Sequence, residues 1–155
     1  MTVNAEEIQR RIDIFERACK EKGAKLTMQR LEIFREIAKS EEHPPAEAIY
    51  QAVSTRLPTI SLDTVYRTLW WLSELGLVVP LGPEHGTRFD ANMTHHHHFV
   101  CAECGLTRDF SSQDLDRLEV PESITAIGSI EGAQVVVKGI CHSCAEKRRS
   151  SANKT

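Results

Sequence analysis

Apolar residues recur every three or four positions through roughly the first 80 residues, which is the period of amphipathic helices. Hydroxyl side chains that can cap a helix precede two of these stretches, and a glycine or proline closes each stretch. The pattern predicts four helices: one with Ile8, Ile12, Phe15 and Cys19 that ends at Gly23, one from Thr27 that ends before Pro44, one from Ala46 to Pro58, and one from Ser61 to Gly76.

A β-hairpin is predicted after the fourth helix, with strands at Leu77–Leu81 and Thr87–Asp90 and a turn at 82–86. Helices followed by such a hairpin make a winged helix, and the last helix then has the form of a DNA-recognition helix. On that helix Arg67 could pair with a guanine edge, and Tyr66 could contact a thymine methyl group or a phosphate. Its polar face also carries Trp71, which we expect to be exposed. The alternative is an ordinary amphipathic helix with no role in DNA binding.

Near residue 91 the helical period gives way to short alternating segments, and most of the histidine and cysteine follows this point. We therefore predict an α+β chain with an N-terminal winged-helix domain at 1–90, a small C-terminal α/β domain at 91–150 and a disordered tail at 151–155. Strands are expected at His95–Cys101, Leu106–Phe110, Ile124–Ile130 and Gln134–Ile140, with short helices at Ser112–Leu118 and after Cys144.

Two C-x-x-C pairs stand in the second domain, Cys101 with Cys104 and Cys141 with Cys144. Four thiolates at this spacing can bind one Zn²⁺ tetrahedrally, and Gly105 permits the tight turn that such a site uses. With four protein ligands the site is closed, so we assign it to stability rather than to catalysis. Two redox dithiols or an iron–sulfur cluster are the alternatives.

Four consecutive histidines, His95–His98, begin the first strand of this domain. Alternate side chains of a strand share a face, so the first and third histidines point one way and the second and fourth the other. The four therefore cannot serve one metal ion. His96 and His98, with nearby oxygens from Asp90 and Asp109, make a mixed nitrogen and oxygen site that suits Fe²⁺, Mn²⁺ or Zn²⁺. The alternative is a surface strand with adventitious metal affinity.

Composition limits the remaining possibilities. The chain has 155 residues, of which 41% are hydrophobic, and folding at this length buries roughly 70% of the unfolded surface, so a core is expected without metal or disulfide staples. The net charge of -3 argues against indiscriminate binding to nucleic acid or membrane, although residues 17–35 hold six basic and two acidic side chains. A solvated helix face is the alternative explanation of that local excess. Without a long apolar run or a signal-peptide core, we expect a soluble, cytoplasmic protein.

Nearly the whole chain, from residue 8 to residue 148, resembles the ferric uptake regulator superfamily of metal-dependent transcriptional repressors. The matching stretches are Leu26–Arg30, His43–Tyr50, Ser61–Leu69, Gly76–Val78, Arg88–Asp90, His96–Gly105, Asp109–Phe110 and Cys141–Cys144. The resemblance implies a homodimer that binds double-stranded operator DNA through its N-terminal domain and dimerises through its C-terminal domain.

The resemblance also implies a set of site residues. A regulatory Fe²⁺ or Mn²⁺ would be held by His43, Asp90, His96, His98 and Asp109, alongside the structural Zn²⁺ of the four cysteines. DNA contacts would come from Lys25, Ser61, Thr64, Tyr66 and Arg67. From its own surroundings His43 is interpreted as a solvated loop residue, and only the resemblance makes it a ligand that joins metal binding to the DNA-binding domain.

Aspartate at both carboxylate positions of that ligand set resembles the peroxide-sensing branch of the superfamily. In that branch Fe²⁺ and hydrogen peroxide lead to oxygen addition at a ligating histidine, which here would be His43 or His96. Peroxide is then the one small molecule expected to act on the protein, and no membrane partner is expected. An iron-responsive repressor that does not sense peroxide is the nearest alternative.

Two other classes of function are open. A metalloenzyme such as a hydrolase could use His96, His98 and Asp109 around an open metal position, but no glutamate stands in a recognisable general-base motif, so no catalytic residue is assigned. A zinc-stabilised interaction module would show no metal-dependent DNA binding. An additional metal site of many relatives lacks its late histidine here, where Ala133 stands, which leaves open a third ion at His95, His97 and Asp116.

Overall fold

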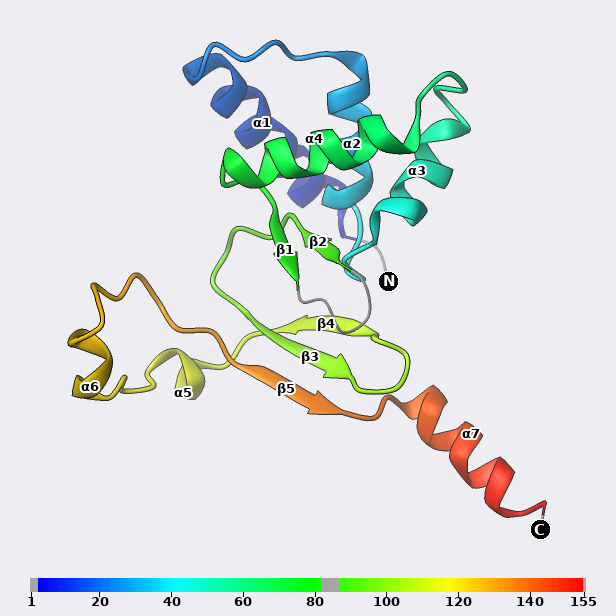
Figure 1. The fold of residues 1–155 in the computed structure, drawn as a ribbon, viewed down its shortest axis with the longest axis vertical. Coiled ribbons are helices and arrows are strands. Elements are labelled where there is room, and N and C mark those ends of the chain that lie inside the picture. The colour runs from blue at the N-terminus through cyan, green and yellow to red at the C-terminus, as the bar shows by residue number, and fades with distance from the viewer. Residues whose placement is uncertain (1–2, 82–86, 155) are drawn as a thin grey trace. The chain divides into compact units, whose positions relative to one another are not determined.

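The computed structural model describes residues 3–81 and 87–154. The chain forms two compact units, Met1–Met93 and Thr94–Thr155. Among the described residues, the first unit contains four helices and a two-stranded sheet, and the second contains a three-stranded sheet and three helices (Figure 1). The predicted α+β fold class is confirmed.

The helices of the first unit are α1 (Ala5–Glu21), α2 (Met28–Ala38), α3 (Ala46–Ser54) and α4 (Leu62–Glu74). Thr27 Oγ1 accepts a hydrogen bond from Arg30 N at 3.2 Å, and Ser61 Oγ accepts one from Thr64 N at 3.1 Å. Both predicted caps are therefore confirmed, and each satisfies a backbone N–H that the first helical turn leaves free. Gly76 closes α4 with φ of +72°, a conformation that glycine adopts without the steric cost of a Cβ.

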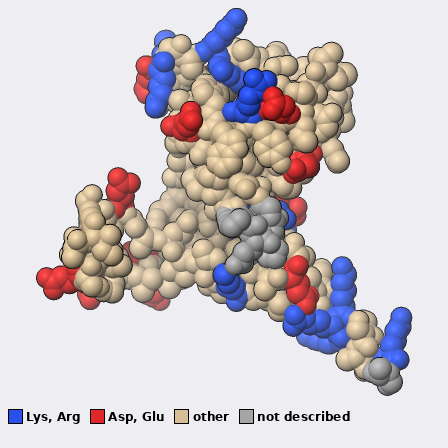
Figure 2. Space-filling model, in the orientation of Figure 1, with Lys and Arg blue, Asp and Glu red and all other residues tan. Residues whose placement is uncertain are grey.

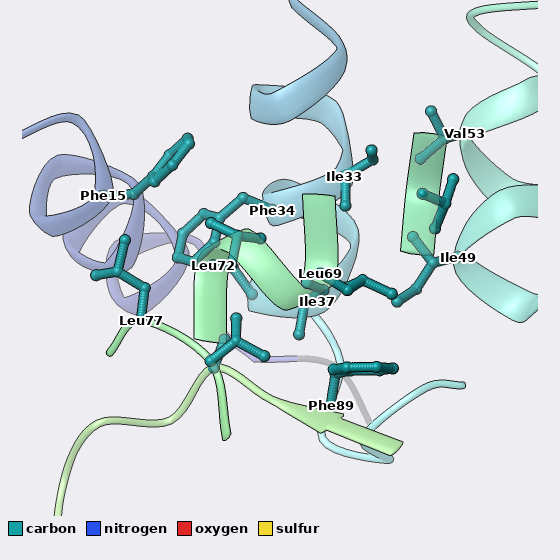
Figure 3. Packing of buried hydrophobic residues seen from close by; sticks show 14 of the residues in the cluster. Phe15, Ile33, Phe34, Ile37, Ile49, Val53, Leu69, Leu72, Leu77 and Phe89 are labelled. Atoms are coloured by element: carbon teal, nitrogen blue, oxygen red, sulfur yellow. The ribbon is translucent and has the colours of Figure 1, made fainter. Parts of the chain in front are cut away.

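The apolar faces of these helices meet in one core, shown in Figure 3. Phe15 of α1 stacks on Phe34 of α2 with ring centroids 4.6 Å apart. Leu69 and Leu72 of α4 are fully buried, and so is Phe89, which enters the same core from the hairpin. Burial of each such side chain contributes about 1.5–3 kcal/mol. This core fixes both helix α4 and the strand that ends at Asp90.

The hairpin consists of β1 (Val79–Leu81) and β2 (Arg88–Asp90), which pair antiparallel with Val79 opposite Asp90. Both predicted strands are confirmed in shortened form, and the predicted turn at 82–86 lies outside the described residues. Pro45 forms an isolated bridge with Arg88, so the segment between α2 and α3 runs beside β2. Four helices followed by this hairpin give the element order of a winged helix.

Glu7 ties the start of α1 to two arginines, and its substitution should lower stability at neutral pH. Its carboxylate pairs with Arg10 Nε at 2.7 Å and Arg11 Nε at 2.9 Å, and Arg11 Nη1 also donates to Ala38 O at 3.0 Å. The hydrogen bond from Arg10, and then the pairing with Arg11, lower the pKa of Glu7 from 4.5 to about 2. A lowered pKa means that the pair stabilises the folded unit above about pH 4.5 and is lost as the pH falls towards 2.

We expect Glu7→Gln to lower the free energy of unfolding of the first unit by about 1 kcal/mol at pH 7, because solvent screens a pair whose carboxylate is 26% exposed. The difference should shrink below pH 4.5. Denaturation followed by tryptophan fluorescence measures this, since Trp70 and Trp71 both lie in α4. Glu6→Gln, at an exposed neighbouring position, is the control. A loss for Glu7→Gln that is equally large at pH 3 and pH 7 would contradict the assignment.

The second unit is built on β3 (His97–Cys101), β4 (Thr107–Phe110) and β5 (Val136–Gly139), in the order β4-β3-β5. Strand β3 pairs antiparallel with β4 and parallel with β5. In this register His98 lies opposite Asp109, and Cys101 lies opposite Gly139. The central strand therefore carries histidines at one end and the first ligand cysteine at the other.

Three helices complete the second unit: α5 (Gln113–Asp116), α6 (Glu122–Thr125) and α7 (His142–Ala152). The strand predicted at Ile124–Ile130 is wrong, because this segment begins in α6 and contains no strand. Its isoleucines at 124, 127 and 130 are spaced by three, which is not the period of two that a strand requires. Helix α7 extends to Ala152, two residues into the segment predicted as a tail.

The buried cluster of the second unit is small. It consists of Cys101, Cys141 and Cys144, with Phe99, Leu106 and Ile140 packed partly buried against it. The expectation of a core without metal or disulfide staples was based on the length of the whole chain, whereas each unit buries its own surface, and for this small unit it stays a prediction.

Candidate metal centres and nucleic-acid interface

The four cysteines of the two C-x-x-C pairs converge at the end of the sheet. Their sulfur atoms all lie within 4.8 Å of one another, and Cys104 Sγ is 3.7 Å from Cys141 Sγ. Cys101 is the last residue of β3, and Cys104 follows it in a tight turn closed by Gly105, whose φ is +74° as expected for the predicted turn. Parallel pairing of β5 with β3 returns the second pair to the same place, and Cys141 and Cys144 begin α7. The chain thus brings four thiols together at the end of the sheet, from β3, the turn that follows it and the start of α7.

Hydrogen bonding shifts the pKa of two of these thiols in opposite directions. Backbone N–H groups, that of Cys104 first and that of Cys141 next, lower the pKa of Cys101 to about 6. The neighbouring sulfurs, with Cys141 first, and burial raise the pKa of Cys144. One thiolate at neutral pH surrounded by three further sulfurs is the starting point of a tetrahedral Zn²⁺ site, since thiolate is the form that binds metal.

A second cluster lies at the other end of β3. His96 Nε2 is 3.1 Å from His98 Nε2, and Asp109 Oδ1 is 3.5 Å and 3.3 Å from these two nitrogens. Ligands held about 2.1 Å from one ion lie about 3.0–3.4 Å apart in tetrahedral or octahedral geometry. The distances of 3.1 Å and 3.3 Å fall in this range and that of 3.5 Å lies just above it, so the three atoms lie close to neighbouring positions on one coordination sphere. Both imidazoles are buried, at 6% and 2% exposed.

The hydrogen bond of His96 fixes which ring nitrogen is available. Its Nδ1 lies 2.5 Å from the carbonyl oxygen of Thr94, and a carbonyl only accepts. The proton is therefore on Nδ1, and Nε2 presents its lone pair to the cluster. This is the usual arrangement of a metal-binding histidine, whose second N–H is held by a carbonyl or carboxylate.

In the first unit, His43 and Asp90 form a buried pair of potential ligands. His43 Nδ1 is 3.4 Å from Asp90 Oδ1, and each side chain is 2% exposed. The backbone N–H of Asn92 donates to Asp90 Oδ1 at 2.8 Å, which holds the carboxylate in place. The interpretation of His43 as a solvated loop residue is wrong. Local sequence gave no sign of its burial, and only the family resemblance predicted that it is a ligand.

The other two histidines of the run face another carboxylate. His95 Nε2 and His97 Nε2 lie 3.1 Å and 2.9 Å from Asp116 Oδ1. His97 Nδ1 accepts a hydrogen bond from Val135 N at 3.1 Å, so Nε2 carries the proton and donates it to Asp116. The predicted alternation of the four histidines between two faces is confirmed. In the structure this group has three possible ligands.

The predicted DNA-contacting residues of α4 are exposed or half-buried and are held by acidic partners. Arg67 Nε pairs with Asp63 Oδ2 at 2.9 Å, with both side chains about three-quarters exposed. Tyr66 Oη donates to Glu47 Oε1 at 2.6 Å, which raises the pKa of Tyr66 and lowers that of Glu47. Exposed pairs of this kind are worth at most about 1 kcal/mol. Both side chains can therefore exchange these partners for phosphate or a base edge at little cost.

Ser61 and Thr64 lie at the first turn of α4, where their side-chain oxygens are 2.9 Å apart. Lys25 is exposed, and its carbonyl accepts a hydrogen bond from Arg30 Nη1 at 2.6 Å. Figure 2 shows Lys and Arg side chains gathered over the end of α1 and the segment that follows it. Basic side chains near a recognition helix suit contacts to phosphate, which position a protein on DNA.

The prediction of an exposed Trp71 is wrong. Arg30 stacks on its ring with the guanidinium carbon 3.9 Å from the centroid, and Phe15 meets it edge to face at 6.3 Å. The half-exposed indole is that of Trp70, which packs against Phe89. The helical wheel placed Trp71 on the polar face correctly, but α1 and α2 reach far enough around α4 to cover it.

A winged helix joined to a unit with clustered cysteine, histidine and aspartate ligands is the arrangement of a metalloregulator. Residues 21–127 match the model of the Ferric uptake regulator family. The peroxide-responsive repressor PerR of Staphylococcus epidermidis (strain ATCC 12228 / FDA PCI 1200) is 30% identical over 148 residues, which cover 95% of this chain and 99% of that protein. The chain belongs to the ferric uptake regulator family.

Solved structures agree with this membership. The ferric uptake regulator of Helicobacter pylori, reported to have three functional metal binding sites, matches 89% of this chain and 93% of its own with a TM-score of 0.71 and 20% identity. The ferric uptake regulator of Vibrio cholerae, reported to show structural rearrangement of its DNA-binding domains, matches 81% of this chain and 98% of its own with a TM-score of 0.64 and 28% identity. Members of the family are transcription regulators, which agrees with the prediction that the chain is not an enzyme.

Proposed function

We propose that the protein is a homodimeric repressor that binds operator DNA when one divalent metal ion is shared by ligands of both units. The first unit contributes His43 and Asp90, and the second contributes His96, His98 and Asp109. The observation that carries the proposal is that four of these five side chains, all but Asp109, are buried, and that Asp90 and His96 are each held by a hydrogen bond to the backbone. Neither group alone fills an octahedral sphere, whereas together they supply five ligand side chains.

The chemistry of the donors favours Fe²⁺ or Mn²⁺ in this shared site. Three imidazoles and two carboxylates form a mixed nitrogen and oxygen set, which these ions accept readily. Zn²⁺ is assigned to Cys101, Cys104, Cys141 and Cys144, whose four sulfurs make a closed site with no position for a substrate. One ion would then stabilise the second unit while the other regulates it.

A shared ion can regulate DNA binding because it favours one arrangement of the two units over others. The shift is limited by the difference in metal affinity between arrangements, which in allosteric proteins amounts to about 5–150-fold in affinity. The structural rearrangement of the DNA-binding domains reported for the V. cholerae relative supports the idea that the two units can adopt different arrangements. Metal occupancy would thereby set the spacing of two α4 helices on the duplex.

Operator DNA is proposed to meet the N-terminal half of α4. Arg67 and Tyr66 would contact bases or phosphates, Ser61 and Thr64 the backbone near the helix start, and Lys25 the minor groove. Their acidic partners would be released on binding at low cost. Phosphate contacts release counterions, so affinity should fall steeply with salt concentration. Because a repressor of this kind must reach operator DNA, we propose that the protein is cytoplasmic.

Dimerisation is proposed to use the second unit. Its exposed apolar side chains are Leu118, Ile124, Ile127, Ile130, Val136 and Val137, and β5 is an edge strand of the sheet. A collection of exposed aliphatic side chains beside an unpaired strand edge is characteristic of an interface, and a two-fold dimer would cover it.

Hydrogen peroxide is the proposed signal. Two observations support it: both carboxylates of the shared site are aspartates, and the 30% identical relative is a peroxide-responsive repressor. When bound, Fe²⁺ supplies the electrons that turn hydrogen peroxide into an oxidant able to add oxygen to an imidazole. The chain contributes His43 and His96 as the side chains that receive the oxygen. An iron-responsive repressor is the second candidate, since solved relatives include iron-uptake regulators.

An anaerobic gel shift tests the function and separates the two candidates. We expect operator binding with either Fe²⁺ or Mn²⁺, and its loss on adding dilute peroxide to the Fe²⁺ sample only. Mass spectrometry should then find one added oxygen atom on the peptide that contains His43 or His96. Loss of DNA binding with both peptides unmodified would contradict peroxide sensing. Equal DNA binding in the presence and absence of metal would contradict the metal-dependent repressor itself.

A further inference from the structure

The loop that carries His43 has an unusual backbone. His43 has φ of +50°, and it is the one residue other than glycine with positive φ in the described part of the chain. A side chain in this left-handed region is sterically disfavoured, so the conformation persists only where neighbouring groups hold it. On one side the loop borders an open cavity of about 380 Å³, lined in part by Ser40, Glu42 and Pro44. On that side Glu42 N donates a hydrogen bond to Ser40 Oγ at 3.1 Å.

Strand β2 holds the loop from the other side through three consecutive residues. Arg88 Nη1 donates to Glu42 O at 3.2 Å and to His43 O at 3.3 Å. Phe89 N donates to Pro44 O at 3.3 Å, and Asp90 faces the His43 ring. The same short strand thus fixes the loop backbone and presents the second ligand of the first unit.

The surroundings of Arg88 are unfavourable for an arginine whose only role is to carry a charge at the surface. Its Nε is buried and has no hydrogen-bond partner among the described residues. A buried N–H without an acceptor is costly, and proteins retain such groups where the rest of the side chain is needed. Here the rest of the side chain is engaged, because its Nη1 donates to two successive backbone carbonyls, those of Glu42 and His43.

We propose that Arg88 is a positioning residue for the shared metal site: it holds the Glu42–His43 backbone in the left-handed turn that aims the His43 imidazole at Asp90. This inference rests on the proposed function, because it assumes that His43 binds the regulatory ion. The ligand pair of the first unit is then formed before metal arrives. The ion then does not have to supply the free energy that orders the loop. The free energy of metal binding is therefore more favourable, and the affinity for the ion is higher.

Mn²⁺ titration of the full chain tests this inference with Arg88→Met, which keeps the length of the side chain and removes its donors. We expect Mn²⁺ affinity to fall 10–100-fold, as is typical when a group that orients a metal ligand is removed. Arg17→Met, an exposed arginine of the same unit, is the matched control and should bind Mn²⁺ within twofold of the parent. Unchanged affinity in Arg88→Met would overturn the proposal.

Two further measurements distinguish positioning from a general loss of stability. Amide hydrogen exchange of the metal-free protein should accelerate at Glu42 and His43 in Arg88→Met and stay unchanged in α2 and α4. In a His43→Ala background, Arg88→Met should change Mn²⁺ affinity less than twofold, because Arg88 acts through His43. An equally large loss in that background would overturn the proposal. If the proposed function itself were wrong, His43→Ala alone would leave Mn²⁺ affinity unchanged. The hydrogen-exchange result would still decide whether Arg88 holds the loop.

Discussion

Cys141→Ser is expected to release zinc and unfold the second unit while the first unit stays folded. The reason is the composition of the buried cluster, in which three of the ligand cysteines are themselves the buried residues and only three partly buried hydrophobics pack on them. In small zinc domains metal binding contributes roughly 10–16 kcal/mol to folding, more than the whole stability of a typical domain. Cys104→Ser should have the same effect although Cys104 is exposed, because it removes a ligand rather than a packing group.

Zinc content by mass spectrometry of the native protein and far-ultraviolet circular dichroism measure this result. Tryptophan fluorescence reports the first unit alone, since both tryptophans lie in α4, and it should stay unchanged. Cys19→Ser is the matched control, because Cys19 is a buried cysteine of the first unit, outside the cluster of four. It should retain one zinc ion per chain. Retention of that ion in both Cys104→Ser and Cys141→Ser would remove the assignment.

His98→Ala is expected to abolish metal-dependent DNA binding without unfolding the protein. His98 lies opposite Asp109 in the β3–β4 register, and its Nε2 faces both Asp109 and His96. Loss of one ligand should lower Mn²⁺ affinity by at least the 10–100-fold that loss of a ligand's hydrogen-bond partner costs. At Mn²⁺ concentrations that saturate the parent protein, the variant should then bind operator DNA as weakly as metal-free protein does.

The control for this variant comes from the same run of histidines. His95 points to the other face of the sheet, where its Nε2 meets Asp116, and its side chain is 53% exposed. His95→Ala should keep Mn²⁺-dependent DNA binding within a few-fold of the parent. If His98→Ala retained full metal-dependent binding, the second unit would not contribute to the regulatory site.

Much of the fold was predictable because the helical and strand periods are strong. The caps at Thr27 and Ser61 and the alternation of the four histidines follow from local rules of backbone geometry. The cysteine cluster was predictable for a similar reason, since ligand spacing is local within each pair and ordered strands return the second pair.

The remaining features depend on contacts between distant segments. The burial of His43 results from a loop held by β2, which lies 45 residues further along the chain. Trp71 is covered by side chains of α1 and α2 that its own helix does not specify. The orienting role of Arg88 was also missed, since the Arg-Phe-Asp triplet gives no sign that its first residue spans two carbonyls.

None of the described helices is long and apolar enough to cross a membrane. Charge is distributed unevenly within the second unit, with basic side chains along α7 and acidic side chains around α5 and α6 (Figure 2). The net charge of the whole chain conceals this separation. Sequence-wide charge totals therefore do not describe the local surfaces.

Small-angle X-ray scattering with and without Mn²⁺, combined with operator affinity on the same samples, tests the shared metal site most directly. We predict that Mn²⁺ changes the scattering profile of the parent protein and raises operator affinity about 5–150-fold, while the His98→Ala variant shows neither response. Identical profiles and identical operator affinity for the parent protein with and without Mn²⁺ would contradict the claim that one ion, bound by both units, controls DNA binding.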